Sequence, residues 1–154
     1  MEDRIEKAQD VLEKLSKLHY DRIQGYDRAK EDTKDADLLA LFSFYEQQSR
    51  QFKSDLNSEI SKYGGEVPDD NSFLGEIHQA WMDLKAAVTG KDRDSVLSSC
   101  EFGEQTIVGA YEDALKYDND DTRLPDALES TLRKQLEELR SAKSRIAALH
   151  ASAD

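Results

Sequence analysis

Residues that interrupt or cross-link a chain are scarce in this sequence of 154 residues. It contains one cysteine, two prolines and seven glycines. A single cysteine excludes an internal disulfide, so a small fold stapled by disulfides is ruled out. Because glycine and proline are the strongest helix breakers, their scarcity favours long helices. The lone cysteine, Cys100, falls on an apolar helix face, where we expect a small core residue in a reducing compartment.

Long apolar runs are missing as well. No stretch approaches the roughly 20 apolar residues that span a membrane, and the first twenty residues are charged rather than apolar, unlike a signal peptide. Acidic residues outnumber basic ones by 33 to 21, which gives a net charge of −12. Such a surface repels nucleic acid and anionic membranes, so neither is an expected partner. We expect a cytoplasmic protein with one domain at residues 1–150 and a frayed tail at 151–154.

Helical periodicity is what the chain has in abundance. Apolar residues recur at steps of three and four along most of its length, which is the spacing of one helix face. Gly64 and Gly65 are suited to end a helix, Asp94 to cap one and Pro125 to occupy a first turn. The pattern predicts an all-α protein with four long helices and one shorter helix, at about residues 3–29, 36–63, 72–89, 94–117 and 123–149.

The short middle helix determines how the long ones connect. At 1.5 Å per residue it would be roughly 27 Å long, which lets it carry the chain from one end of a bundle to the other. The helices at 36–63 and 94–117 would then run parallel, as in a ferritin-like four-helix bundle with one long crossover. An up-and-down array of five helices is the alternative. A short repeat favours the crossover, because Tyr26-Asp-Arg-Ala29 resembles Tyr111-Glu-Asp-Ala114 at an offset of 85 residues.

A polar residue interrupts the apolar face of each long helix near its midpoint. Helices packed side by side would bring these residues to one height, so the sequence predicts a buried polar layer. A buried carboxylate is costly unless it is paired, hydrogen-bonded or bound to metal, which makes the partner of Glu104 decisive. Pairing with Arg22 or His19 would make the layer structural and fix the register of the helices. The polar layer comprises His19, Arg22, Ser49, Glu104 and Gln135.

A metal site is the alternative role for the same layer. Ferritin-like carboxylate centres use a Glu from each of two helices and a Glu-x-x-His motif from each of the other two. The second helix has Ser at the His position of residues 46–49, and the last helix has Arg there in residues 137–140. The sequence therefore predicts neither a two-metal centre nor another cofactor. A single Fe, Mn or Zn ion remains as an alternative, with the ligands His19, Glu46 and Glu104.

Other candidates for chemistry are few. No Ser-His-Asp or Cys-His arrangement and no glycine-rich phosphate loop is recognisable, so no catalytic residue is assigned. His78 falls at the edge of a helix face, and His150 falls just beyond the last predicted helix, at the start of the C-terminal tail. Trp81 and Met82 suit a core, but a crossover helix lies outside the main bundle. If they are half covered, they would form a patch for a protein partner or for a second copy in a homo-oligomer.

Five segments cover nearly the whole chain and carry a family resemblance. They are LHYDRIQGYDRA (18–29), ISKYGGEVPDD (60–70), IHQAWMDLKAAVTG (77–90), CEFGEQTIVGAYEDAL (100–115) and KQLEELRSAKSRI (134–146). Through them the chain resembles a bacterial family of uncharacterised four-helix-bundle proteins, a domain of unknown function counted among the ferritin-like folds. The resemblance implies the fold, a bacterial cytoplasmic origin and an association with stress, but no activity, substrate or cofactor. We therefore expect a non-enzymatic structural, interaction or stress-associated protein.

Overall fold

The computed structural model describes residues 2–68, 92–117 and 122–152, and in them the regular structure is four long α-helices. The all-α prediction is confirmed for these residues. The predicted helix at 72–89, with Trp81 and Met82, lies outside them and stays a prediction. None of the four helices combines the length and the apolar character that crossing a bilayer requires. Their bounds are Glu2–Glu31 for α1, Ala36–Lys62 for α2, Arg93–Ala114 for α4 and Asp126–Ala151 for α5.

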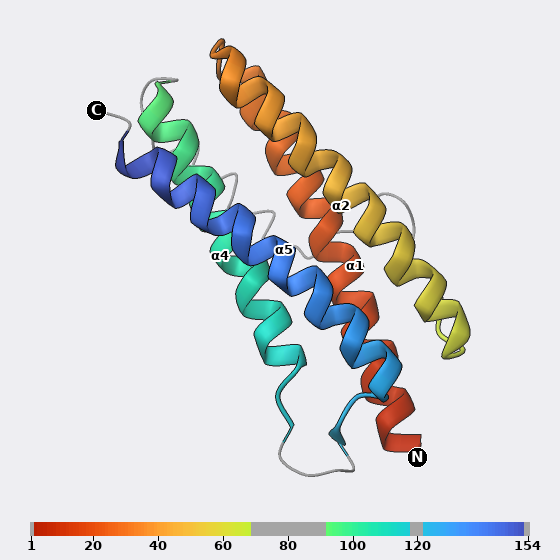
Figure 1. Ribbon diagram of the computed structural model, residues 1–154. Helices are drawn as coiled ribbons and strands as arrows, with labels where there is room; N and C mark the ends of the chain where they lie inside the picture. The colour runs from red at the N-terminus through yellow and green to blue at the C-terminus, as the bar shows by residue number, and fades with distance from the viewer. Residues whose placement is uncertain (1, 69–91, 118–121, 153–154) are drawn as a thin grey trace.

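The four helices form two antiparallel hairpins that pack side by side (Figure 1). One hairpin is α1 with α2, and the other is α4 with α5. Figure 1 shows α2 and α4 running in the same direction, so α2 ends at the opposite end of the bundle from the start of α4. Each hairpin buries its apolar face against the other, which is how a helix bundle forms its core.

The start of α4 differs from the predicted one. Asp92, not Asp94, is the N-cap: its side chain accepts a hydrogen bond of 2.8 Å from the backbone N–H of Ser95. Both aspartates suit a helix start, but only Asp92 lies three residues before a free N–H that its carboxylate reaches. Asp94 then falls in the first turn, where its negative charge is favourable next to the helix N-terminus.

The other helix ends differ by one to three residues. α1 continues to Glu31 rather than 29, α2 stops at Lys62 rather than 63, and α4 stops at Ala114 rather than 117. Pro125 precedes α5 instead of lying in its first turn. α5 begins at Asp126 rather than 123 and continues to Ala151 rather than 149. Helix ends fray, and apolar periodicity specifies them less well than it specifies the helix interior.

Gly64 and Gly65 end α2 with a specific pattern of backbone hydrogen bonds. Gly64 has a φ of +78°, a left-handed conformation that costs glycine little. Its N–H donates to the carbonyl of Ser61 at 3.2 Å, and the N–H of Gly65 donates to that of Ile60 at 3.0 Å. This pair of bonds is a Schellman motif, which satisfies carbonyls left without partners at a helix C-terminus. The predicted role of the two glycines is confirmed.

In residues 2–68, 92–117 and 122–152, the apolar core consists of two clusters that lie on either side of the polar layer. The larger cluster surrounds Leu12, Leu56 and Leu132, all of them fully buried. The smaller one surrounds Phe42, Leu97 and Ile146, nearer the end where α4 begins. The polar layer is therefore enclosed by apolar side chains along the bundle axis, which lowers the local dielectric and strengthens the interactions within it.

Candidate functional site: a buried polar layer

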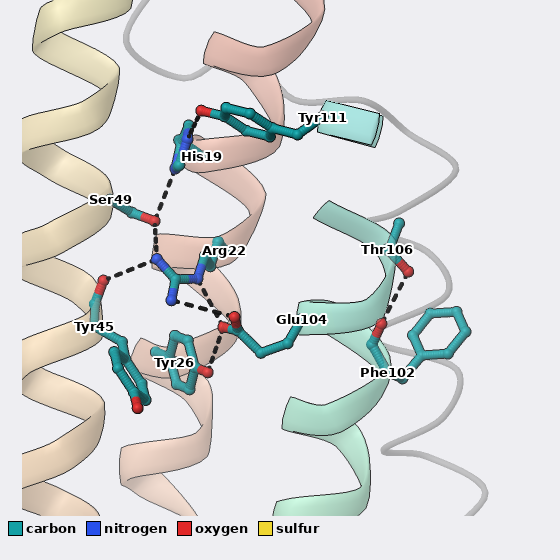
Figure 2. Close-up of polar contacts among 9 residues, drawn as sticks. All are labelled: His19, Arg22, Tyr26, Tyr45, Ser49, Phe102, Glu104, Thr106 and Tyr111. Atoms are coloured by element: carbon teal, nitrogen blue, oxygen red, sulfur yellow. Dashed lines mark hydrogen bonds and ion pairs between the residues drawn. The ribbon is translucent and has the colours of Figure 1, made fainter. Parts of the chain in front are cut away.

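A buried ion pair between α1 and α4 lies at the centre of the polar layer (Figure 2). Arg22 and Glu104 expose 1% and 0% of their side chains. Arg22 Nε donates to Glu104 Oε1 at 2.7 Å, and Arg22 Nη2 donates to Oε2 at 3.3 Å, so the contact is bidentate. Burial by itself would lower the pKa of Arg22, but the adjacent Glu104 carboxylate, together with Tyr26 and Tyr45, raises it above its ordinary value. Bidentate charge-assisted bonds of this kind are among the strongest in proteins.

Two tyrosines complete the surroundings of this pair. Tyr26 Oη donates to Glu104 Oε1 at 2.5 Å, so three donors converge on the Glu104 carboxylate, two from Arg22 and one from Tyr26. Burial, and then the charge of Glu104, raise the pKa of Tyr26 well above its ordinary value. The guanidinium lies 5.4 Å from the ring centre of Tyr26 and 5.3 Å from that of Tyr45, within the range of cation–π attraction.

A chain of hydrogen bonds leads from the ion pair across all four helices. Arg22 Nη1 donates to Ser49 Oγ at 2.8 Å, and Ser49 Oγ lies 2.9 Å from His19 Nδ1. His19 Nε2 lies 2.7 Å from Tyr111 Oη, which donates to Gln135 Oε1 at 2.6 Å. Figure 2 shows the part of this chain on α1, α2 and α4. The structure thus brings together all five residues of the polar layer.

Which atom donates in each of these hydrogen bonds follows from the two ends of the series, where Arg22 donates and Gln135 Oε1 accepts. Tyr111 has one hydroxyl hydrogen and gives it to Gln135, so Tyr111 accepts a hydrogen from His19 Nε2. His19 Nδ1 is then an acceptor, and Ser49 donates to it while accepting from Arg22. This arrangement requires a neutral imidazole with its hydrogen on Nε2. Burial, followed by the charge of Arg22, lowers the pKa of His19 well below its ordinary value, in agreement with the neutral form.

The contacts between α1 and α4 are reciprocal. His19 on α1 meets Tyr111 on α4, and Glu104 on α4 meets Tyr26 on α1. In each helix the tyrosine follows the polar residue by seven positions, and the two pairs are related by the offset of 85 residues found in the sequence. Two antiparallel helices with equivalent residues at equivalent heights have local twofold symmetry. The repeated Tyr-containing segments are therefore the two halves of one contact.

Comparison with known families decides the affiliation. A family model described as "Domain of unknown function (DUF2383)" matches residues 7–117. The chain belongs to the DUF2383 family. The predicted resemblance to a family of uncharacterised four-helix-bundle proteins is thereby confirmed, while the bacterial origin and the ferritin-like relationship stay predictions. No curated protein matches the chain.

The span matched by the DUF2383 model contains most of the polar layer. Arg22 and Glu104, their tyrosine partners, and His19 with Ser49 all lie within residues 7–117. Gln135, on α5, lies beyond it. The arginine–glutamate contact that joins the two hairpins is therefore contained in the family region, and α5 adds the acceptor at the end of the chain of hydrogen bonds.

The three residues of the alternative metal site are not arranged as a set of ligands in this DUF2383 chain. Glu46 is buried, and its Oε2 accepts from Lys30 Nζ at 3.2 Å. His19 and Glu104 use their nitrogens and oxygens for the bonds described above. Within residues 2–68, 92–117 and 122–152, no group of three or more His, Cys, Asp or Glu side chains is close enough to hold a metal ion.

Two members of the network were not assigned to it from the sequence. Tyr26 and Tyr111 are fully buried and lie on the predicted apolar faces, where an aromatic ring is an ordinary core residue. The signal that could have identified them is their repeat, since each follows a polar residue of the layer by seven positions. A buried tyrosine hydroxyl needs a partner, and one at the height of a carboxylate or imidazole has one available.

Proposed function

We propose that this DUF2383 chain is a ferritin-like bundle in which an arginine–glutamate pair occupies the part of the core that other such bundles use for metal. In this proposal the protein is not an enzyme. It acts as a structural or interaction protein associated with stress conditions. Two features support the ferritin-like assignment: α2 and α4 run in parallel, and α2 ends at the opposite end of the bundle from the start of α4 (Figure 1).

The engagement of Glu104 is the observation that carries the proposal. Its carboxylate is fully buried and receives three donors, two from Arg22 and one from Tyr26. A metal ion at this position would have to displace a guanidinium that is itself held by Ser49 and by two aromatic rings. The positive charge that a metal would supply is already present. The carboxylate is therefore neutralised without a cofactor.

The titration of the other groups also argues against acid–base catalysis. A general acid or base works best when its pKa lies near the operating pH. Burial lowers the pKa of His19 well below its ordinary value and raises the pKa of Tyr111 well above its own. Both groups are thereby fixed in their neutral forms around neutral pH, and both already have hydrogen-bond partners. The most economical role for the layer is to set which helix faces meet and at what height.

A single-ion site is the second candidate, and one observation favours it. Glu46 exposes only 4% of its surface, and its Oε1 has no hydrogen-bond partner in the part of the chain that the structure describes. Burial raises the pKa of Glu46, although Lys30 opposes the shift. An unsatisfied buried carboxylate oxygen is a plausible ligand for one Fe, Mn or Zn ion. His19 and Glu104 would have to leave their present partners to join it.

Elemental analysis of protein purified without chelator separates the two candidates. The structural proposal predicts a metal-to-chain ratio near zero, also after incubation with Fe²⁺, Mn²⁺ or Zn²⁺ followed by desalting. A ratio near one that is lost in both Glu46→Ala and Glu104→Ala would overturn it. Glu112→Ala is the matched control, because Glu112 is a half-exposed residue of α4 that pairs with Arg140 at the surface.

A further inference from the structure

A second cluster of ionisable groups lies where α5 ends and α4 begins. His150, in the last turn of α5, exposes 28% of its side chain and lies between two carboxylates of α4. Its Nδ1 is 2.5 Å from Glu101 Oε2, and its Nε2 is 3.1 Å from Asp94 Oδ1. Asp94 and Glu101 are seven residues apart and so share one face of α4, two turns from each other. The imidazole bridges them.

The chemistry of the two partners determines which form of the imidazole fits. An ionised carboxylate only accepts hydrogen bonds, whereas a neutral imidazole has one N–H and one bare nitrogen. A neutral His150 would therefore present a lone pair to one of the two carboxylates. Only the charged imidazolium, with a hydrogen on each nitrogen, satisfies both contacts at once. The geometry of the contact thus depends on a proton that histidine gains and loses near neutral pH.

We propose that His150 is a pH-sensitive latch, which fastens the last turn of α5 to the first turns of α4 when it is protonated and releases it when it is not. The apolar contacts just inside the latch are those of the smaller core cluster, in which Leu97 and Cys100 of α4 pack with Ile146 of α5. Opening the latch loosens the edge of this cluster and leaves the polar layer, further along the bundle, in place.

The electrostatic surroundings of His150 agree with the latch. The hydrogen bond to Glu101 raises the pKa of His150 more than burial lowers it, and the charge of Asp94 raises it further. The C-terminus of α5 also favours a cation. Among the residues that the structure describes, a further charged cluster at this end is Arg93 with Asp35 and Asp37, which joins the start of α4 to the start of α2 and is paired within itself.

The direction of the pH dependence follows from the raised pKa. The unfolded-state pKa of histidine is about 6.5, and the folded-state value lies above it. The stabilisation is therefore complete below about pH 6.5 and is lost as the pH rises through the folded-state pKa. Each pKa unit of difference changes the opening equilibrium of the latch tenfold. The last turn of α5 should be closed in mildly acidic solution and more open in alkaline solution.

Two measurements on the full chain test the latch. An NMR titration of the imidazole should give a pKa above 6.5 for His150, and this pKa should fall in Glu101→Gln and not in the control Glu112→Gln. Hydrogen exchange of the amides in the last turn of α5, compared with His150→Gln at each pH, should show protection at low pH that disappears at high pH. A pKa at or below 6.5 would overturn the proposal. So would a pKa that Glu101→Gln leaves unchanged, or a protection ratio independent of pH.

Discussion

Replacing Glu104 with alanine removes the one carboxylate that neutralises the centre of the bundle. Arg22 would remain as an unpaired cation with 1% of its side chain exposed, and removing one partner of a buried ion pair costs about 3–5 kcal/mol. Tyr26 would also lose its hydrogen bond to the Glu104 carboxylate, and a hydrogen bond to a charged group contributes about 1.5–3 kcal/mol. Because both losses arise from one carboxylate they are not additive, and we expect about 4–6 kcal/mol in total.

Thermal and urea denaturation followed by circular dichroism measures this loss. One kcal/mol corresponds to roughly 2–4 °C for a chain of this size, so Tm should fall by about 10–20 °C. Glu112→Ala is the matched control on the same helix, because its partner Arg140 is 55% exposed and exposed pairs contribute about 0.2–1 kcal/mol. If Glu104→Ala lowers Tm no more than Glu112→Ala does, the carboxylate is not the electrostatic centre of the fold and our reasoning fails.

A variant that replaces the whole group by apolar residues separates two costs: the loss of the ion pair, and the presence of a buried charge without a partner. In Arg22→Met with Glu104→Leu and Tyr26→Phe, no member of the group remains charged or lacks a partner. Replacing a whole buried ion pair by apolar residues is often neutral or stabilising, by about 1–4 kcal/mol. We expect this triple variant to regain most of the stability that Glu104→Ala loses. A triple variant less stable than Glu104→Ala would show that the pair itself, rather than its neutrality, stabilises the bundle.

Three further predictions concern the same layer. Arg22→Ala should lower Tm, and millimolar guanidinium should raise the Tm of the variant but not that of the wild type, because the free ion fits the vacated position. An equal effect of guanidinium on both proteins would contradict this. Tyr111→Phe should cost about 1–3 kcal/mol, since His19 and Gln135 each lose a partner; an unchanged urea midpoint would argue against the chain of bonds. Burial raises the pKa of Tyr26 and Tyr111, so their stabilisation holds below about pH 10 and is lost as the pH rises through the folded-state values. An absorbance titration should show both ionising only with unfolding, and their early ionisation in intact protein would refute it.

The residues of the helix interiors were predictable from the sequence, and so was the position of the polar layer. Apolar steps of three and four specify which face is buried, and a carboxylate within such a face is conspicuous in a sequence. The pairing of Glu104 with Arg22 rather than His19 was left open, because both are on the same face of α1. Which of them reaches the carboxylate depends on the height at which α1 and α4 meet, and that is a tertiary property.

The remaining differences have local physical causes. Tyr26 and Tyr111 were read as core residues because a ring gives no indication of where its hydroxyl finds a partner. His150 was expected just beyond the last helix, predicted to end at 149, whereas it is helical and bridges two carboxylates of α4. Such a contact is invisible in the periodicity of α5, since it joins a polar residue at a helix end to residues about 50 positions earlier in the chain. Asp92 is the N-cap because its carboxylate accepts from the N–H of Ser95, three residues later. Asp94 already lies within the first turn of α4.

The fixed order of hydrogens from Arg22 to Gln135 has a consequence for how the sequence can change. Each hydroxyl in this chain of hydrogen bonds has a single hydrogen, which is already donated to one acceptor. Ser49→Ala would therefore deprive both Arg22 and His19 of a hydrogen-bond partner on another helix. Substitutions at these positions should show strong epistasis, with variants tolerated only in matched combinations. Chimeras that exchange one hairpin between diverged members of the family should then fold only when the two hairpins carry compatible versions of the layer.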